Sequence, residues 1–497
     1  MTMVKSLLLG SAAGLVAVAG AQAADLPVKA KAVEYVKVCS AYGAGYFYIP
    51  GTDTCLKIGG YARVDAIVGA APTFRPAIAS SASAAFSGPN AGVYTYPFRD
   101  DGDADYLTRV RGVVDLDART QTDYGTLRSY VRFGGQWDSQ ASAGTGPNSG
   151  FYFERAFIQF SGFTFGYTQS FFELGTNYMM TTPYAGSNTW TSLIGYTAQF
   201  GNGFSASIAL EDAANRTTGV QAATATGTAF FYSNNRFDTQ VNTASSGGLA
   251  YKNYQAGQTV PDIVANIRLD QAWGSFLLSG ALHQVNALDY TNNTFFNAAY
   301  AGASSTDNWG WAIGAQAEFK LPFLAAGDSL LLQANYSDGA LNYVGASANS
   351  QGVATSWGRI KVDSAGYLSG AFIPLADAVR VNDFGDYSTV QAWAIQGQLR
   401  HYWTPGLRSV VYGGYVNVDM PTSTVVAVTS ANLWQVGTDL VWSPVKNLDL
   451  GLEAVYTKVE SSDPLQNVYN ARGTAVTSVI GGSADVWSGG FRAQRNF

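Results

Sequence analysis

Charged side chains recur at every second position in two neighbouring stretches of the sequence. In a β-strand this spacing places all of them on one face. Guanidinium and carboxylate groups gathered on one face can attract ions, repel ions or pair with one another. The chemistry predicted from these residue types is therefore electrostatic, and the charged positions are Arg109, Arg111, Asp115, Asp117, Arg128 and Arg132.

Apolar or small residues fill the positions between these charges, and a polar break at 120–125 separates the two stretches. The pattern predicts a β-hairpin with one charged face and one apolar face. In a soluble protein the apolar face would point inward. In a transmembrane barrel the order is inverted, because apolar faces meet lipid and charged faces line a water-filled lumen.

The N-terminus favours export. Lys5 precedes an apolar run at 7–19, and Ala21-Gln-Ala follows as a small-x-small cleavage site. We therefore predict a signal peptide over 1–23 and a mature chain that begins at Ala24 with a lead and cysteine loop over 24–55. A membrane-anchoring helix is the alternative, but the run falls short of the about 20 residues needed to span a bilayer.

Composition suits strands that are apolar on one face only. The chain has 55 glycines and 29 tyrosines among 497 residues, and charged residues make up 13%, about half of the globular norm of ~25%. The formal net charge is −6, and no clustered basic face of the kind that binds nucleic acid is evident. We expect no nucleic-acid partner.

Period-two patterns predict about sixteen strands, which is an even number as in single-chain bacterial barrels. Their connections alternate between short turns and long polar stretches, as in an up-and-down antiparallel barrel with periplasmic turns and extracellular loops. The first strand begins at Leu56, so that 56–497 forms the barrel, and the others cover 105–118, 125–137, 151–161, 163–172, 193–200, 204–212, 262–272, 275–287, 309–320, 329–337, 389–403, 408–419, 432–443, 448–459 and 486–497.

The strand ends add two features. Trp309, Trp311, Trp434 and Trp442 lie near strand ends on apolar faces, as in interfacial girdles that contact outer-membrane lipid. The last strand ends at Phe497. A terminal phenylalanine on an amphipathic strand resembles the signal that the barrel-assembly machinery recognises.

The cysteines, Cys39 and Cys55, would reach an oxidising compartment after export, and we expect them to form a disulfide. A metal site is the alternative. It lacks a convincing ligand set, because the histidines, His283 and His401, lie far apart in the sequence. We expect no cofactor.

Four segments resemble the general porins of alphaproteobacterial outer membranes. They are AQAADLP at 21–27, VCSAYGAGYFYIPGTDTCLKIGGY at 38–61, RAFIQFSGFTFG at 155–166 and FRAQRNF at 491–497. The resemblance covers both ends and the first third of the chain. It implies a sixteen-stranded barrel, usually a homotrimer, that passes small hydrophilic solutes and whose third long loop folds into the lumen.

By strand count that constriction loop is 173–192. It holds one acidic residue, Glu173, and neither lysine nor arginine, whereas such loops commonly set several acidic groups against an arginine-rich wall. A passive pore needs a wet lumen, a narrow point and fixed charge that biases ions there.

The alternation of side chains along each strand predicts which residues face the lumen and supply that charge. The basic wall is assigned to Lys57, Arg63, Arg109, Arg111, Arg128, Arg132 and Arg155, and the groups that oppose or partner it are Asp65, Asp115, Asp117 and Glu173. The alternative is that salt bridges to the aspartates turn the arginines into lumenal bracing. A slip of one residue would reverse every assignment. The basic wall leans weakly towards anions.

Other functions were weighed against a passive pore in the outer membrane. An outer-membrane enzyme needs a nucleophile with a base, and neither His283 nor His401 lies in such an arrangement, so we predict no enzyme. A secreted β-sandwich or adhesin could use the same alternation for a soluble core. A substrate-selective channel should display an aromatic slide, for which the loop residues Tyr178, Met179, Met180 and Tyr184 are too few.

Overall fold

The computed structural model describes residues 37–68, 83–85, 93–95, 106–139, 148–180, 185–224, 250–253, 257–289, 304–346, 355–362, 369–381, 386–423, 430–461, 465–469, 475–479 and 483–497. The signal peptide expected over 1–23 lies outside these residues. The chain divides into two compact units, Met1–Leu56 and Lys57–Phe497.

The first unit holds the disulfide. Cys39 and Cys55 are joined, which confirms the expected pairing over the metal alternative. A 3-10 helix, η1 (Ser40–Tyr42), and a short strand, β1 (Phe47–Tyr48), lie inside the closed loop. Both cysteines and Tyr46 are buried together, and β1 pairs with the first two residues of the next strand.

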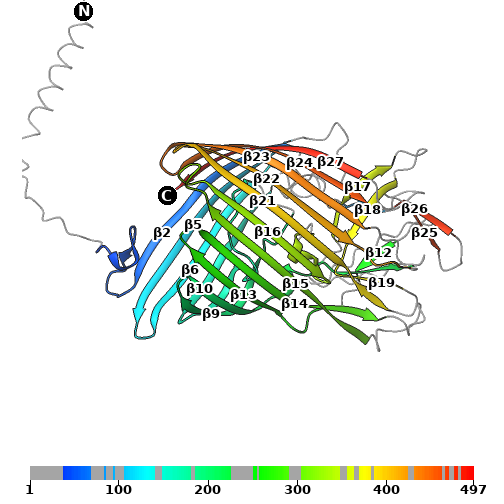
Figure 1. The fold of residues 1–497 in the computed structure, drawn as a ribbon, viewed down its shortest axis with the longest axis horizontal. Coiled ribbons are helices and arrows are strands. Elements are labelled where there is room, and N and C mark those ends of the chain that lie inside the picture. The colour runs from blue at the N-terminus through cyan, green and yellow to red at the C-terminus, as the bar shows by residue number, and fades with distance from the viewer. Residues whose placement is uncertain are drawn as a thin grey trace, which may run out of the picture. The chain divides into compact units, whose positions relative to one another are not determined.

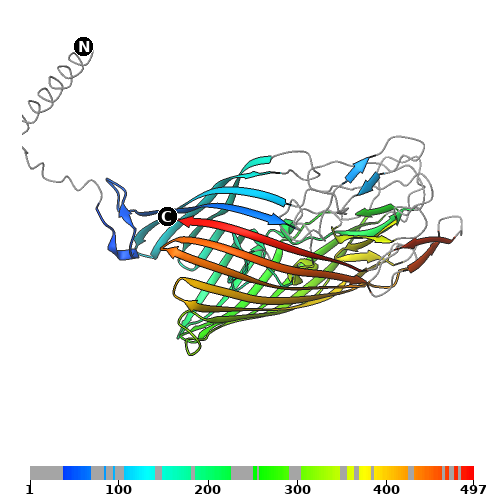
Figure 2. The same ribbon diagram turned by 90° about the horizontal axis from the view of Figure 1, so that it is seen from above.

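The second unit is a closed β-barrel (Figures 1 and 2). Its strands belong to one sheet of 17, of which β1 is an edge addition and the other sixteen form the barrel. These are β2 (Cys55–Val68), β5 (Tyr106–Thr122), β6 (Gly125–Asp138), β7 (Asn148–Phe160), β8 (Phe163–Gln169), β9 (Trp190–Gly201), β10 (Phe204–Glu211), β13 (Asp262–Gln271), β14 (Gly274–Asp289), β15 (Ser304–Lys320), β16 (Ser329–Asp338), β21 (Gln391–Thr404), β22 (Leu407–Asp419), β23 (Ala431–Val445), β24 (Leu448–Ser461) and β27 (Ser483–Asn496).

The last strand closes the barrel against the first. β27 pairs antiparallel with β2, with Phe491 opposite Ala66. The Phe497 amide donates to the Gly60 carbonyl at 3.1 Å, and the Gly60 amide donates back at 3.3 Å. Gly60 has φ of +156°, and a Cβ there would lie 2.1 Å from the Val113 carbonyl oxygen. Only glycine permits this approach of three backbone segments.

Short turns and long connections alternate, as the sequence predicts. The long connections gather at one end (Figure 1) and carry small sheets of their own. These comprise the pairs β3 (Ser83–Ala85) with β4 (Val93–Thr95), β17 (Thr355–Val362) with β18 (Ser369–Leu375) and β25 (Leu465–Tyr469) with β26 (Ala475–Val479), and a four-stranded sheet of β11 (Val220–Thr224), β12 (Ala250–Asn253), β19 (Ala378–Arg380) and β20 (Tyr387–Thr389).

Two of these connections, 213–261 and 338–388, were expected only as loops. They also contain the 3-10 helices η3 (Ala213–Asn215) and η4 (Leu341–Val344). β11 pairs in parallel with β19, with Val220 opposite Ala378. The partners lie so far apart in the sequence that local periodicity does not reveal them.

The barrel is inverted relative to a soluble core. Large apolar side chains stand exposed on its outer face, such as Ile395 at 50% and Leu452 at 61%, whereas the polar side chains of Gln398 and Asp439 are buried. A soluble β-sandwich would reverse this order, so that alternative is wrong. No helix among the described residues is long and apolar enough to cross a membrane.

Aromatic side chains border the apolar band on both sides. Near the long connections, Trp393 lies 5.1 Å from Tyr415 and Trp434 lies 5.1 Å from Tyr456, as measured between ring centroids. Near the short turns, Trp403 is 62% exposed. This arrangement is typical of the interfacial girdles of outer-membrane barrels.

We predict that arginine is tolerated outside this band and not within it. Leu399 points outward between Trp393 and Trp403, and Leu399→Arg should lower the free energy of unfolding from lipid vesicles by about 2–4 kcal/mol. Val445, next to a short turn and 59% exposed, is the matched control, because Val445→Arg should cost about 0–1 kcal/mol. Equal losses in a urea titration would contradict the assignment of the band.

Candidate functional site

The predicted charged residues other than Glu173 lie together on the inner face of β2, β5, β6 and β7. Strand pairing sets Asp115 opposite Arg132 and Arg119 opposite Arg128. Asp65, Arg109 and Asp117 are buried, whereas their chain neighbours Val64 and Val110 are exposed on the outer face. Alternate residues of these strands therefore point to opposite sides of the barrel wall. We call this surface the arginine wall.

Most of the arginine wall is internally paired. The Arg109 guanidinium donates to both oxygens of Asp138, at 2.6 and 2.8 Å. Arg128 makes the same two-fold contact with Asp117, at 3.0 and 2.8 Å. Arg119 lies 2.9 Å from the same carboxylate. Bidentate pairs of this kind are the strongest charge-assisted hydrogen bonds in proteins.

The first and last strands contribute a similar triad. Asp65 lies 2.9 Å from Arg63 on its own strand and 2.6 Å from Arg492 on β27. The pairing joins the two strands that close the barrel. The bracing alternative thus holds for Arg63, Arg109, Arg128 and, through Glu154, Arg132.

A β-bulge in β7 supplies the partner of Arg132. β7 pairs Arg155 with Arg132 but Phe153 with Phe133, so Glu154 is the extra residue. Both Glu154 and Arg155 therefore face inward. Glu154 lies 2.9 Å from Arg132 and accepts a hydrogen bond from the Tyr61 hydroxyl at 2.8 Å.

Several residues of the wall were missed by sequence reasoning. Arg119 and Arg492 share the parity of their predicted neighbours and could have been included on that signal. Asp138 is the last residue of β6 and lies one residue beyond the strand predicted over 125–137. Glu154 could not have been found by alternation, because strict period two places it on the outer face whenever Arg155 points inward.

Two arginines keep an uncompensated charge. Among the described residues, no carboxylate lies within 4.0 Å of Arg111 or Arg155. Arg111 donates to the side-chain oxygen of Gln136 at 2.8 Å and lies over the Tyr152 ring at 5.2 Å. Arg155 lies 4.3 Å from the centre of the Trp190 ring. Lys57, at the start of β2, is exposed.

The connection between β8 and β9 runs inside the barrel, on the wall across from the arginines. Inward amide side chains bind its backbone. Gln316 accepts from the Leu174 amide at 2.8 Å and donates to the Phe172 carbonyl at 3.0 Å. Gln398 accepts from the Tyr178 amide at 2.7 Å. We call the described part of this segment, 170–180 and 185–189, the inserted loop.

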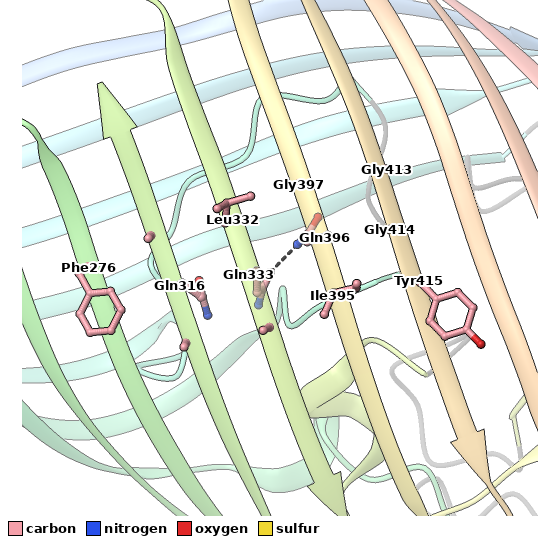
Figure 3. Close-up of a pocket in the computed structure, with 13 residues that line it drawn as sticks. Phe276, Gln316, Leu332, Gln333, Ile395, Gln396, Gly397, Gly413, Gly414 and Tyr415 are labelled. Atoms are coloured by element: carbon pink, nitrogen blue, oxygen red, sulfur yellow. Dashed lines mark hydrogen bonds between the residues drawn. The ribbon is translucent and has the colours of Figure 1, made fainter. Parts of the chain in front are cut away.

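The supporting wall extends over β13, β15, β16, β21 and β24. Gln333 on β16 donates to the Ser187 carbonyl at 3.4 Å, and Glu453 on β24 accepts from the Met180 amide at 3.2 Å. Figure 3 shows Gln316, Gln333 and Gln396 on adjacent strands, with a hydrogen bond from Gln396 to Gln333.

Glu173 does not face the arginine wall, contrary to expectation. Its side chain is 1% exposed and lies 3.2 Å from Arg216, a residue of the connection after β10. Burial raises the pKa of Glu173, although Arg216 and hydrogen bonds from Gln169 and Ser187 lower it in part. The carboxylate is buried behind the loop, so its charge is not set against the wall.

A closed antiparallel barrel with an apolar outer face, a charged inner face and an inserted loop defines the class of outer-membrane porin-type barrels. Within that class, the chain belongs to the family described as the Porin subfamily, whose model matches residues 25–488.

Related proteins agree with this placement. Porin Omp2b of Brucella canis is 34% identical over 283 residues, which cover 55% of this chain and 64% of the relative. Porin Omp2b of Brucella abortus matches at the same identity and coverage. The chain thus spans less than two thirds of the length of these curated relatives. The outer membrane channel DcaP of Acinetobacter baumannii shares the fold, with 15% identity, a TM-score of 0.53 and coverage of 90% of this chain and 99% of that one.

Proposed function

We propose that this protein is a passive diffusion pore for small hydrophilic solutes and ions in the bacterial outer membrane. The observation that carries the proposal is the position of the inserted loop. It is bound to the wall formed by β13–β24, across the barrel from the charged face of β2–β7. Passage between the two surfaces requires no catalysis, only water, a size limit and fixed charge.

The proposed filter is the arginine wall. Its members are Lys57, Arg63, Asp65, Arg109, Arg111, Asp115, Asp117, Arg128, Arg132 and Arg155, with Arg119, Asp138, Glu154 and Arg492 added and Glu173 removed. Arg119 and Arg128 share Asp117, and Arg63 and Arg492 share Asp65, so each of these groups keeps one positive charge. Arg111 and Arg155 add to this excess, and the wall should be positive overall. Charges beyond about 8–10 Å are largely screened at physiological salt, so a weak preference for anions follows.

A substrate-selective channel is supported less well. Aromatic rings do lie among the arginines, as such a channel would require. Their faces are covered, however, because Arg132 lies 5.1 Å from the Tyr61 ring and Arg128 lies 5.2 Å from the Tyr130 ring. A ring already stacked on a guanidinium offers little open surface to a solute, which favours the general pore.

We also propose a homotrimer. The outer face of β6–β9 carries exposed aromatic rings in contact with one another, such as Phe151 and Phe153 at 5.6 Å and Phe163 and Tyr196 at 4.8 Å. A second copy would bury this surface. Light scattering of the detergent-solubilised protein should give three times the mass of one chain, and a mass of one chain would contradict the proposal. Recognition of Phe497 by the barrel-assembly machinery stays a prediction.

Channel activity is tested by liposome swelling with a graded series of sugars. Vesicles that contain the purified protein should swell in small sugars, and the rate should fall steeply as the sugar approaches the width of the passage. Protein unfolded by heat before reconstitution is the control. If folded protein produces no swelling and no conductance in planar bilayers, the proposed function is wrong.

Selectivity is tested by the reversal potential in a salt gradient. A unit charge about 8 Å from an ion in water contributes about 0.5 kcal/mol, so Arg111→Gln or Arg155→Gln should lower the anion-to-cation permeability ratio about twofold. Glu154→Gln should raise it by a similar factor, because Arg132 loses its partner. The double variant Arg132→Gln with Glu154→Gln removes a neutral pair and should change little. A wild-type channel with clear cation preference would contradict this assignment.

A further inference from the structure

One arginine is buried completely outside the arginine wall. Arg216 follows η3 in the connection between β10 and β13, and none of its surface is exposed. Arginine is almost never fully buried unless its charge is paired. Neither barrel closure nor the arginine wall uses this residue, so its contacts must explain its position.

The guanidinium of Arg216 contacts residues at both ends of the inserted loop. It lies 3.2 Å from the Glu173 carboxylate near the start of the loop and donates to the Ser187 hydroxyl near the end at 2.7 Å. Ser187 in turn donates to Glu173 at 2.8 Å. The Thr189 amide donates to the same carboxylate oxygen at 2.5 Å.

The opposite side of Arg216 connects to the barrel. Its guanidinium lies 4.0 Å from the centre of the Tyr343 ring, which belongs to η4. The Tyr343 hydroxyl donates to Asp262 on β13 at 2.6 Å. Asp262 also lies 2.7 Å from Nδ1 of His283 on β14. Arg216 therefore contacts two other connections, and Tyr343 links it through Asp262 to β13 and β14.

We propose that Arg216 is a positioning residue that holds the inserted loop on the β13–β24 wall and thereby sets the width of the passage. The inference rests on the proposed function, because it assumes that this loop limits the pore. The loop is thus held in place by a residue of a different connection, the one between β10 and β13.

Charge, rather than packing volume, is what the position requires. Glu173 is buried with Arg216, and Glu211 is also fully buried and accepts the Phe171 amide at 2.7 Å. The pKa of Arg216 is raised because burial, which lowers it, is outweighed by Tyr343, Glu173 and Glu211. Removing the cation would leave Glu173 buried without a counterion, and the loop can relieve this by moving into the lumen.

The test measures loop protection and conduction separately. In Arg216→Met, the amides of 174–180 should exchange hydrogen on the order of a hundredfold faster, as expected when one partner of a buried ion pair is removed. Single channels should show larger current fluctuations and an altered sugar exclusion limit. Arg495→Met, which removes an exposed arginine at the chain end, is the matched control and should leave both readouts unchanged.

Two further variants separate positioning from general destabilisation. Arg216→Met with Glu173→Gln removes both charges and should restore exchange and conductance towards wild type, and Arg216→Lys should restore them in part. Shifted migration of the unheated protein on a gel shows that each barrel is folded. Wild-type exchange and conductance in folded Arg216→Met would overturn the proposal, as would a double variant no closer to wild type. If wild-type protein conducts nothing while exchange in Arg216→Met still rises, only the pore function fails.

Discussion

Hydrocarbon offers no partner to a backbone N–H or C=O group, so a sheet that crosses a membrane has to close on itself. In this chain the closure depends on the last strand, because β27 pairs with β2 and the Phe497 and Gly60 backbones exchange hydrogen bonds. The ion pair between Arg492 and Asp65 reinforces the same seam from the inside. Once the barrel is closed, strand alternation decides which side chains meet lipid and which meet the lumen.

Inside the barrel, the backbone N–H and C=O groups of the inserted loop also need hydrogen-bond partners. It forms no strand across this segment, so its backbone groups need other partners. Amide side chains such as Gln316 and Gln398 provide them. Neutral amides can bind both N–H and C=O groups without adding charge. Charged side chains such as Glu453 and Arg268 also contact the loop, and together with the amides they hold it across the barrel from the arginine wall.

The arginine wall combines bracing and filtering in different residues. Arg109 forms a bidentate pair with Asp138 that neutralises its charge, whereas Arg128 shares the Asp117 carboxylate with Arg119. Arg111 and Arg155 are stacked on aromatic rings instead, and a ring face does not cancel a unit charge. The two interpretations that the sequence left open therefore both apply. The net charge of the lumen is therefore smaller than its number of arginines, and the shared carboxylates and the ring-stacked arginines together decide its effect on ions.

Sequence periodicity predicted the strands and the shared face of residues such as Arg109 and Arg132, and together with the export signal, the alternation of short and long connections and the terminal strand it indicated the barrel class. Side-chain direction in a strand follows from local covalent geometry, so alternation reveals it. Only the tertiary structure decided which charges are paired. Glu154 faces inward through a bulge, and Glu173 is buried by Arg216 from another connection. Register shifts and contacts between distant segments leave no local pattern, because they depend on how the whole chain packs.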